Sequence, residues 1–301
     1  MNDPYHVYMD LDVMNNDYNS TSKPQLRFEE TRNTPFLPGD SADYFCSIVR
    51  FNIQTGNTLP VFIPRIETGQ SDINKTIYRV QFNLHHEDVA WHGTTNIVYT
   101  PEDATTTLPA APTVSQDVSG SYYYIYNCQH LIHLVNVAIE AAWENLKNQV
   151  IEDPGTGGTA RWNTWTQGTV VPFMDFDPIT NRAWLQADER LFQEGSVPRF
   201  RLCFDDRLSE LFAGLPFKKD SADGITAYPP WAHIRFINRY NNRVKQKNAL
   251  NQDIHMLQAY QETTSIALWN PVASIVFASS LLPIVPTQTS APKDIGNQSN
   301  I

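Results

Sequence analysis

Residues 128–153 read CQHLIHLVNVAIEAAWENLKNQVIED, and this stretch differs in character from the chain on either side of it. It contains no Gly or Pro, and apolar side chains recur in it every three or four residues, as they do along one face of a helix. These apolar positions are Leu131, Val135, Ala138, Ile139, Ala142, Leu146 and Val150. Pro154 and Gly155 follow as stop signals, so the pattern predicts one long helix over about 128–151.

The segments around this helix have the pattern of β-strands. Residues 75–84, KTIYRVQFNL, place Tyr78, Val80, Phe82 and Leu84 on one face of an extended chain, which is typical of a half-buried strand. Further strands are predicted at 6–14, 43–55, 94–100, 120–127, 169–176, 182–187, 198–204, 231–240 and 272–279.

Turn residues join two of these strands. Asp177 and Pro178 open a tight turn that Asn181 can close, so 169–176 and 182–187 are predicted to form a hairpin.

Two further segments have distinct local signals. Prolines within residues 59–66 exclude a central strand there and predict a sheet edge or a loop crossing. A short helix is predicted over about 205–213, with an aspartate as N-cap and Gly214 as stop.

Nine or ten short strands with Pro-rich connections indicate a mainly β fold, and a jelly-roll β-sandwich is its eight-stranded version. We expect a jelly-roll domain over residues 1–215 that holds the long helix and has an N-terminal arm or loop at 15–40. Residues 216–292 then form a further β segment, either an extension or the incomplete second roll of a double jelly roll. Residues 293–301 form a polar tail.

Composition excludes several classes of protein. The 301 residues are 12% aromatic and 18% charged, which is typical of a globular chain. The formal net charge is −10 with no basic block at either end, which argues against packaging nucleic acid through a basic arm. Cys46, Cys128 and Cys203 lack CxxC spacing and predict buried thiols in a reducing compartment. The N-terminal residues do not have the pattern of a secretory signal.

Two histidine groups are the candidates for a metal site. Within residues 84–92, one group gathers His85, His86, Glu87, Asp88 and His92. Consecutive residues of a strand point to opposite faces, so His85 and His86 do not converge, and an exposed strand end is the favoured interpretation. His130 and His133 share a helix face without a third ligand, which favours an interface or core-edge pair. No metal or cofactor is predicted.

Two carboxylates are the candidates for catalysis. Asp175 and Asp177 share one face of a strand, as general acid/base pairs in glycoside hydrolases require, but Asp before Pro also opens turns. The turn role is favoured, and no catalytic residue is predicted. No GxSxG, P-loop, GxGxxG or HExxH motif is present.

One basic segment interrupts the acidic background between residues 224 and 252. It contains no Asp or Glu before Gln252, and Trp231, Phe236 and Tyr240 are interleaved with its cations. These cations are Arg235, Arg239, Arg243, Lys245 and Lys247. Such a mixture can bind nucleic acid, but it is more often a solvated hairpin or an interface with an acidic neighbour. Nucleic-acid contact is not expected, and if it occurs it involves these five residues.

The most apolar segment lies at residues 266–286. It is long enough to span a bilayer, but Asn270, Pro271 and Pro283 interrupt it and no Lys or Arg flanks it. We therefore predict a buried strand over residues 273–282 and no membrane span. The polar residues 286–301 either bind a neighbouring subunit or lead into further sequence.

This order of elements, with a long helix after about six strands in an acidic chain, resembles capsid proteins of tailless icosahedral viruses. The resemblance is to major capsid and penton proteins built from single or double jelly rolls, in the adenovirus-like and tailless-phage lineage. Three segments are similar in amino-acid sequence to segments of such virion proteins: SIVRFNIQTGNTLPVFIPRI (47–66), FRLCFDDRLSELFAGLPF (200–217) and LWNPVASIVFASSLLPIVPTQTSAP (268–292).

The resemblance implies a structural capsid subunit without an active site. Its partners would be copies of itself, as a trimer or pentamer, and other capsid proteins, held through sheet edges, loops and the arms at 15–40 and 286–301. It would reside in the virion after assembly in a reducing host compartment. Two alternatives remain. One is a carbohydrate- or receptor-binding sandwich that stacks sugars on Tyr122–Tyr124 and the tryptophans, and the other is a glycoside hydrolase that uses Asp175 and Asp177.

Overall fold

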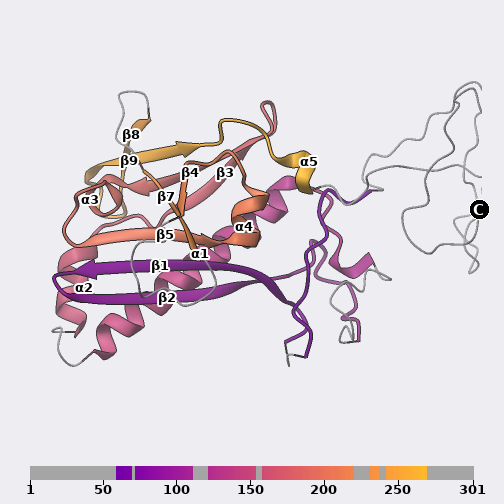
Figure 1. Ribbon diagram of the computed structural model, residues 1–301, viewed down its shortest axis with the longest axis horizontal. Helices are drawn as coiled ribbons and strands as arrows, with labels where there is room; N and C mark the ends of the chain where they lie inside the picture. Colours follow the sequence, from indigo (N-terminus) through magenta and orange to yellow (C-terminus); the bar gives the residue numbers. More distant parts are fainter. Residues whose placement is uncertain are drawn as a thin grey trace, which may run out of the picture. The chain divides into compact units, whose positions relative to one another are not determined.

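The computed structural model describes most of the central chain (Figure 1). The described residues are 59–69, 72–110, 121–153, 158–219, 231–236 and 242–269. All of them belong to one compact unit, Ile53–Val276. The strands predicted at 6–14, 43–55 and 272–279, and the two arms, lie outside the described residues.

A five-stranded antiparallel sheet forms one layer of the fold, in the order β2-β1-β5-β7-β6. Its strands are β1 (Lys75–His86), β2 (Val89–Val98), β5 (Arg199–Asp205), β6 (Phe217–Lys219) and β7 (Trp231–Ile234). Val80 and Phe82 of β1 are fully buried and lie opposite Phe204 and Leu202 of β5. The alternation within residues 75–84 therefore predicted both the strand and its buried face.

A four-stranded antiparallel sheet forms the second layer, in the order β3-β4-β9-β8. Its strands are β3 (Phe173–Asp177), β4 (Arg182–Asp188), β8 (Arg243–Lys247) and β9 (Asp253–Tyr260). The predicted hairpin is confirmed as β3–β4, and Asn181 closes its turn with a φ of 54°.

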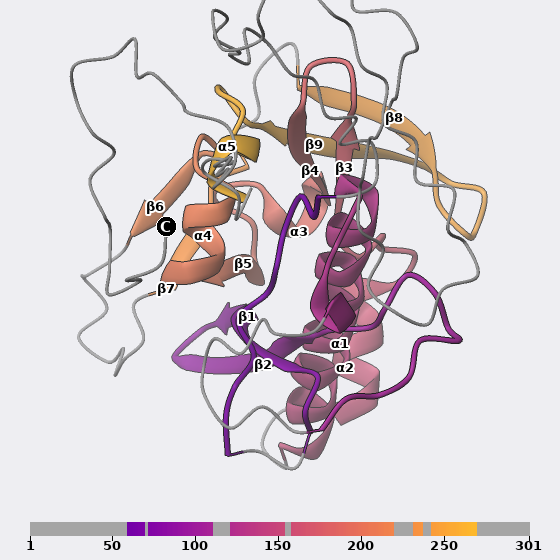
Figure 2. The ribbon, with the colours of Figure 1, turned by 90° about the vertical axis from the view of Figure 1, so that its right-hand side faces the viewer.

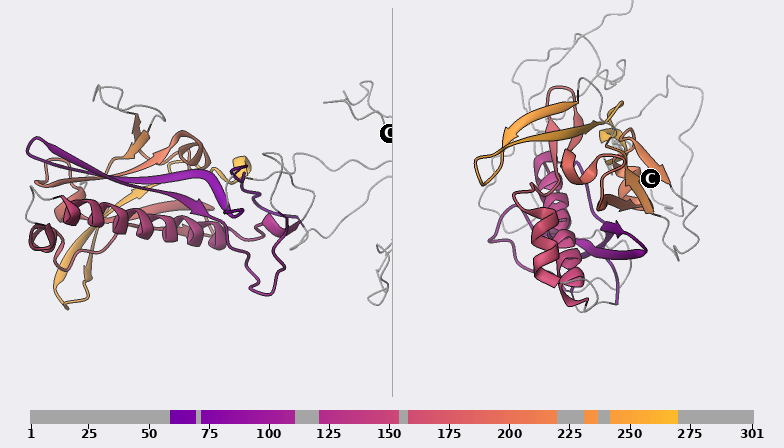
Figure 3. Two further views of the ribbon diagram at one scale, coloured as in Figure 1. Left: turned by 90° about the horizontal axis from the view of Figure 1, so that it is seen from below. Right: turned by 90° about the vertical axis from the view of Figure 1, so that its left-hand side faces the viewer.

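Helix α1 (Cys128–Glu152) confirms the long helix that the sequence predicts. Asn127 is its N-cap and accepts a hydrogen bond from the main-chain nitrogen of His130 at 2.7 Å. All seven predicted apolar positions are buried. The helix packs against β1, β2 and β3, and so it contacts both sheets (Figure 3). A short helix, α2 (Gly158–Thr166), packs against it (Figure 2).

The two sheets and α1 share one apolar core. Phe82 of β1, Leu185 of β4 and Ile139 of α1 are fully buried in it. The Trp143 ring of α1 lies 5.2 Å from that of Phe82 and the same distance from that of Phe200. The prediction of a mainly β sandwich with one long helix is confirmed by this arrangement.

Polar side chains of α1 also cover one edge of each sheet. The Asn136 amide donates to the main-chain oxygen of Met174 in β3 at 2.8 Å and accepts from the Met174 nitrogen at 2.7 Å. The Asn145 amide donates to a main-chain oxygen of β2 at 3.0 Å, and the Gln149 side chain accepts from a main-chain nitrogen of β2 at 3.1 Å. Among the described strands, β2 and β3 have no partner on this side, and these bonds take its place.

The short helix predicted over 205–213 is confirmed as α4 (Asp206–Leu211). The Asp205 carboxylate caps it by accepting from the main-chain nitrogen of Leu208 at 2.9 Å. Gly214 has a φ of 97°, and a Cβ there would lie 2.9 Å from the main-chain oxygen of Thr263. The stop signal therefore reflects both a left-handed conformation and a close approach of the backbone.

The strand predicted at 120–127 is wrong. A 3-10 helix, η2, occupies Ser121–Tyr123, and Ile125 forms only an isolated bridge with Phe62. The rings of Tyr122 and Tyr123 lie 5.4 and 5.3 Å from that of Tyr99, so both neighbours turn to one side. A strand would place them on opposite faces.

Other differences are elements that the sequence patterns did not indicate. They are α2, β6, β8, β9, α3 (Glu189–Phe192) and α5 (Ile266–Trp269). Residues 59–66 form isolated bridges, as expected for a loop crossing. No helix in the described part of the chain is long and apolar enough to cross a membrane.

Candidate functional site

Asp175 and Asp177 take up local roles in the β3–β4 turn. The Asp177 carboxylate accepts hydrogen bonds from the Thr180 hydroxyl at 2.6 Å and the Ile179 main-chain nitrogen at 2.9 Å. These bonds lower the pKa of Asp177, the hydroxyl bond most. The Asp175 carboxylate accepts from the nitrogen of Phe176 at 2.7 Å. A glycosidase acid needs a raised pKa, so this geometry favours the turn role.

The cluster at 85–92 forms the hairpin between β1 and β2. His85 and His86 point to opposite faces, as the strand pattern requires. His86 stacks on Trp165 at 4.8 Å between ring centres, whereas His85 lies 6.4 Å from His92. The His92 Nδ1 lies 2.8 Å from the Asn83 side-chain oxygen. Within the described residues, no three or more His, Cys, Asp or Glu side chains come together as a metal site would need.

The second histidine pair lies on the first turns of α1. The His130 Nε2 is 2.7 Å from the main-chain oxygen of Thr100, and the rings of His130 and His133 are 6.3 Å apart. This contact ties α1 to the chain that leaves β2, which matches the structural interpretation of the pair.

Half of the aromatic residues proposed to stack on sugars lie in the interior. Tyr123 is buried, and so are four tryptophans: Trp91, Trp143, Trp162 and Trp269. The other three tryptophans, Trp165, Trp184 and Trp231, are partly exposed, as are Tyr122 and Tyr124. The carbohydrate-binding alternative loses half of its proposed contacts in this arrangement.

The basic segment places three of its five cations on β8, at the edge of the four-stranded sheet. Lys245 and Lys247 lie 2.8 and 3.0 Å from the Asp253 carboxylate, and Arg243 lies 2.6 Å from that of Glu189. The bonds from the two lysines lower the pKa of Asp253, the bond from Lys245 most.

The remaining cations do not extend this group into a nucleic-acid platform. Arg235 follows β7 in the other sheet and lies 3.5 Å from a carboxylate oxygen of Glu194. Arg239 and Tyr240 lie outside the described residues, and Phe236 is buried. A stacking surface needs exposed aromatic rings beside cations without partners, and the described residues do not form one.

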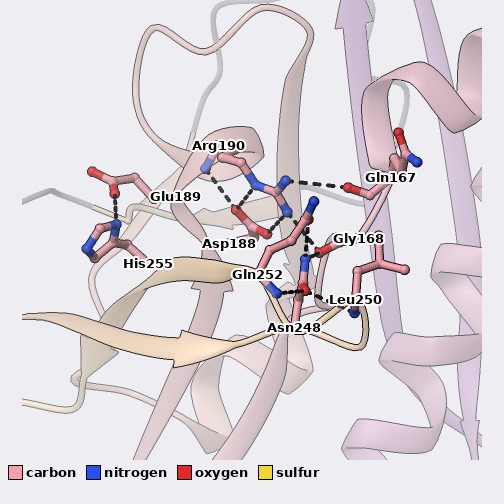
Figure 4. A network of polar contacts seen from close by, with 9 residues as sticks. All are labelled: Gln167, Gly168, Asp188, Glu189, Arg190, Asn248, Leu250, Gln252 and His255. Atoms are coloured by element: carbon pink, nitrogen blue, oxygen red, sulfur yellow. Dashed lines mark hydrogen bonds and ion pairs between the residues drawn. The ribbon is translucent and has the colours of Figure 1, made fainter.

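A network of polar contacts fixes the turn between β8 and β9 to the body of the molecule (Figure 4). The Asn248 side chain donates to the main-chain oxygen of Gly168 at 2.8 Å. Its oxygen accepts from the main-chain nitrogens of Leu250 at 3.0 Å and Gln252 at 2.8 Å. A Cβ at Gly168 would lie 2.5 Å from this amide, so the two segments meet in direct contact.

An ion pair between the buried Asp188 and the partly exposed Arg190 extends this network. The Asp188 side chain is fully buried and accepts from the Arg190 guanidinium at 3.0 and 2.6 Å. The carboxylate raises the pKa of Arg190. The same guanidinium donates to the oxygen of Gly168 at 2.9 Å, which joins the end of β4 to the contact made by the turn. The hairpin β8–β9 is therefore held at its turn as well as along β9 (Figure 4).

Sequence reasoning identified the cations of this surface but missed its elements. No regular alternation marks β8, since most of its side chains are exposed on both faces. Asn248 carried no signal, because its role depends on Gly168 from another part of the chain. Asp188 and Arg190 are only two residues apart, but no motif marked them, and their link to the turn runs through the same distant Gly168. The surface is an exposed, charged sheet edge with a fixed turn, and its described residues form no catalytic arrangement.

Comparisons with known proteins add an independent finding. The model of the family described as Sputnik minor capsid protein V18/19 matches residues 7–301. A protein of Sputnik virophage, described as uncharacterized protein V18, is 30% identical over 157 residues, which cover 50% of this chain and 90% of that protein.

Solved structures resemble the chain as well. A chain in the 3.5 Å cryo-EM structure of the Sputnik virophage superposes with a TM-score of 0.63 at 21% identity, over 87% of this chain and 67% of that chain. This likeness shows a shared fold. The mavirus penton protein gives a TM-score of 0.31 at 12% identity, over 70% of this chain and 57% of that one.

Proposed function

Because the chain belongs to the Sputnik minor capsid protein V18/19 family, it is a structural subunit of a viral capsid and not an enzyme, and we propose that it assembles with copies of itself. The match over residues 7–301 is the observation that carries this proposal. The expected product is a closed homo-oligomer, a trimer or a pentamer, that contacts other capsid proteins in the virion.

Free sheet edges and exposed loops support self-association. In the part of the chain that the structure describes, β6 and β8 each have a strand neighbour on one side only. Ile179, at the tip of the β3–β4 turn, is 90% exposed, and Val197 is 82% exposed. Apolar side chains of this kind gain stability when a neighbouring subunit covers them. The segments 15–40 and 286–301 remain the proposed arms.

We propose that residues after 215 extend the first domain and do not start a separate roll. Strand β9 pairs with β4, and β7 pairs with β5, so both sheets continue across this point. Residues 216–292 are then an extension of the jelly roll and 293–301 its polar tail.

The state of the two described cysteines supports the proposal that the protein assembles in a reducing host compartment. Cys203 is buried and Cys128 is partly buried, and both are thiols that are not joined in a disulfide. Burial raises the pKa of Cys128 and so disfavours its reactive thiolate. Such thiols persist without oxidation in a reducing environment.

Light scattering coupled to size-exclusion chromatography tests the proposal. The purified chain is expected to elute as trimers, pentamers or larger particles, and negative-stain images should show rings or shells of uniform size. A chain that remains monomeric at every concentration and binds a glycan array would overturn it. Asp175→Asn should leave assembly unchanged, because Asp175 acts only within its own strand.

A further inference from the structure

The sheet edges on the two sides of the sandwich differ in whether other groups cover them. On one side, amide side chains of α1 cover the edges of β2 and β3. On the other side the sheets end with β6 and β8, which have no second strand neighbour among the described residues. Strand β8 is the longer of the two, with five residues against three. It is therefore the main unpaired edge of the described fold.

The register of β8 shows which main-chain groups face outward. The Gln258 nitrogen donates to the Asn242 oxygen at 2.8 Å, and the Asn248 nitrogen donates to the Gln252 oxygen at 3.0 Å. Hydrogen-bonded pairs alternate along an antiparallel ladder, so even-numbered residues of β8 bond to β9. The N–H and C=O groups of Arg243, Lys245 and Lys247 point away from β9, toward the open edge.

The same three residues carry the positive charge of the strand. The Lys245 and Lys247 side chains are 61% and 59% exposed, and both share the single carboxylate of Asp253. One of these two ammonium charges is therefore in excess within the described hairpin. Each residue of β8 whose main-chain N–H and C=O face the open edge therefore also has a positively charged side chain.

These charges disfavour the antiparallel pairing of β8 with a second β8. An antiparallel pair centred on Lys245 would place that residue opposite its own copy and Arg243 opposite Lys247. Like charges directly opposite each other destabilise a sheet. A partner strand with carboxylates at the matching positions would instead gain the main-chain bonds and an ion pair with the ammonium charge that Asp253 leaves in excess.

The turn of the hairpin is fixed by contacts within the chain itself. Asn248 holds the turn against Gly168, and Arg190, paired with the buried Asp188, donates to the same Gly168 oxygen. An edge that is already ordered loses little conformational entropy when a strand adds to it. A charged edge that only prevents aggregation does not need this support.

We propose that β8 binds an extended, acidic segment of a neighbouring capsid subunit, which adds to the four-stranded sheet as an antiparallel strand. Its carboxylates stand at alternate positions, opposite Arg243, Lys245 and Lys247. This inference rests on the proposed assembly function and names a surface through which it acts.

A peptide with the sequence of residues 6–14, HVYMDLDVM, is a suitable probe, because Asp10 and Asp12 have the required spacing. We expect the full-length protein to bind it at low salt and release it as salt rises. A peptide with Asp10→Asn and Asp12→Asn should bind at least about tenfold more weakly. A peptide that keeps both aspartates but has N-methyl groups on their main-chain nitrogens should also lose binding, because those nitrogens would face β8.

Residue-resolved amide hydrogen exchange distinguishes strand addition from simple charge attraction. Without peptide, the amides of Val244 and Gln246 should be protected, and those of Arg243, Lys245 and Lys247 should exchange fast. Saturating peptide should slow the second set at least about tenfold. Binding without this change would overturn the proposal, and so would the absence of binding, which would leave β8 as an edge that only resists aggregation.

Charge variants complete the test. Lys245→Glu with Lys247→Glu should abolish binding of the acidic peptide and allow binding of a peptide with Asp10→Lys and Asp12→Lys. Lys147→Glu is the matched control, because Lys147 pairs with Glu144 on the exposed face of α1. Light scattering on the same samples separates the two proposals. If the wild type assembles but binds no peptide, only the β8 inference fails, whereas a wild type that never assembles refutes the proposed function.

Discussion

At Gly93 the main chain of β2 lies so close to α1 that no side chain fits between them. A Cβ there would lie 2.3 Å from the main-chain oxygen of Ala142 and from the nitrogen of Leu146. Both are backbone atoms of the helix and cannot move independently. A glycine within a strand has several explanations, so the sequence did not indicate this contact.

Gly93→Ala should therefore destabilise the fold by about 3 kcal/mol, because α1 must move away from the sheet. Urea unfolding followed by circular dichroism measures this loss. Val98→Ala, at an exposed position of the same strand, is the control and should change stability by less than about 0.5 kcal/mol. Equal stability of the two variants would contradict the contact.

Asp205 is a buried carboxyl that caps α4. Burial raises its pKa most, against bonds from Leu208 and Arg79 that lower it. Between the ordinary carboxyl value, about 4, and the raised value, the folded state keeps a proton that the unfolded chain has released. This group therefore stabilises the fold fully at low pH, and its contribution falls as the pH rises through that window.

Asp205→Asn removes the titration but keeps the side-chain oxygen that caps the helix. Relative to this variant, the wild type should lose stability as the pH rises from about 4 to 7. Asp205→Ala also loses the cap and should be less stable than Asp205→Asn by about 1 kcal/mol. Denaturant titrations at several pH values measure both effects, and a constant difference between wild type and Asp205→Asn would argue against the raised pKa.

At the scale of elements, α1 contributes through two faces of different chemistry. Its apolar stripe was evident in the sequence, because Leu131 to Val150 follow the helical period. Its polar contacts were not, because Asn136 and Gln149 gain their roles only when the edges of β3 and β2 lie beside the helix. An amide on a helix surface has no periodic signal of its own.

Asn136→Ala tests how much the Asn136 amide stabilises the fold by covering the edge of β3. The variant leaves the N–H and C=O of Met174 without their partner, which should cost about 2 kcal/mol. Thermal unfolding measures the loss, and aggregation should increase because the β3 edge is uncovered. Val137→Ala, at the next and half-exposed position, should leave both properties nearly unchanged. If Asn136→Ala has the same stability and aggregation as this control, water satisfies the Met174 main-chain groups equally well, and the amide does not stabilise the β3 edge.

At the scale of the whole molecule, assembly and folding should be separable. Removal of residues 286–301 takes away a proposed arm, whereas the described core lies within residues 59–269. We expect the shortened chain to unfold within a few degrees of the full chain and to form fewer oligomers at equal concentration. Sedimentation velocity and calorimetry test this together. Unchanged assembly would mean that sheet edges and loops suffice.

The sequence by itself determined the local elements whose signals are local. Periodicity specified α1 and the buried face of β1, and caps and turn residues specified α4 and the β3–β4 hairpin. The predicted strand at Tyr122–Tyr124 failed because the contacts with Tyr99 overrode β propensity. Only the tertiary structure decided that β8 is an open, charged edge, that Asn136 covers β3, and that Gly168 receives Asn248. Each of these depends on groups far apart in the chain, and their meeting is a property of packing that no local pattern encodes.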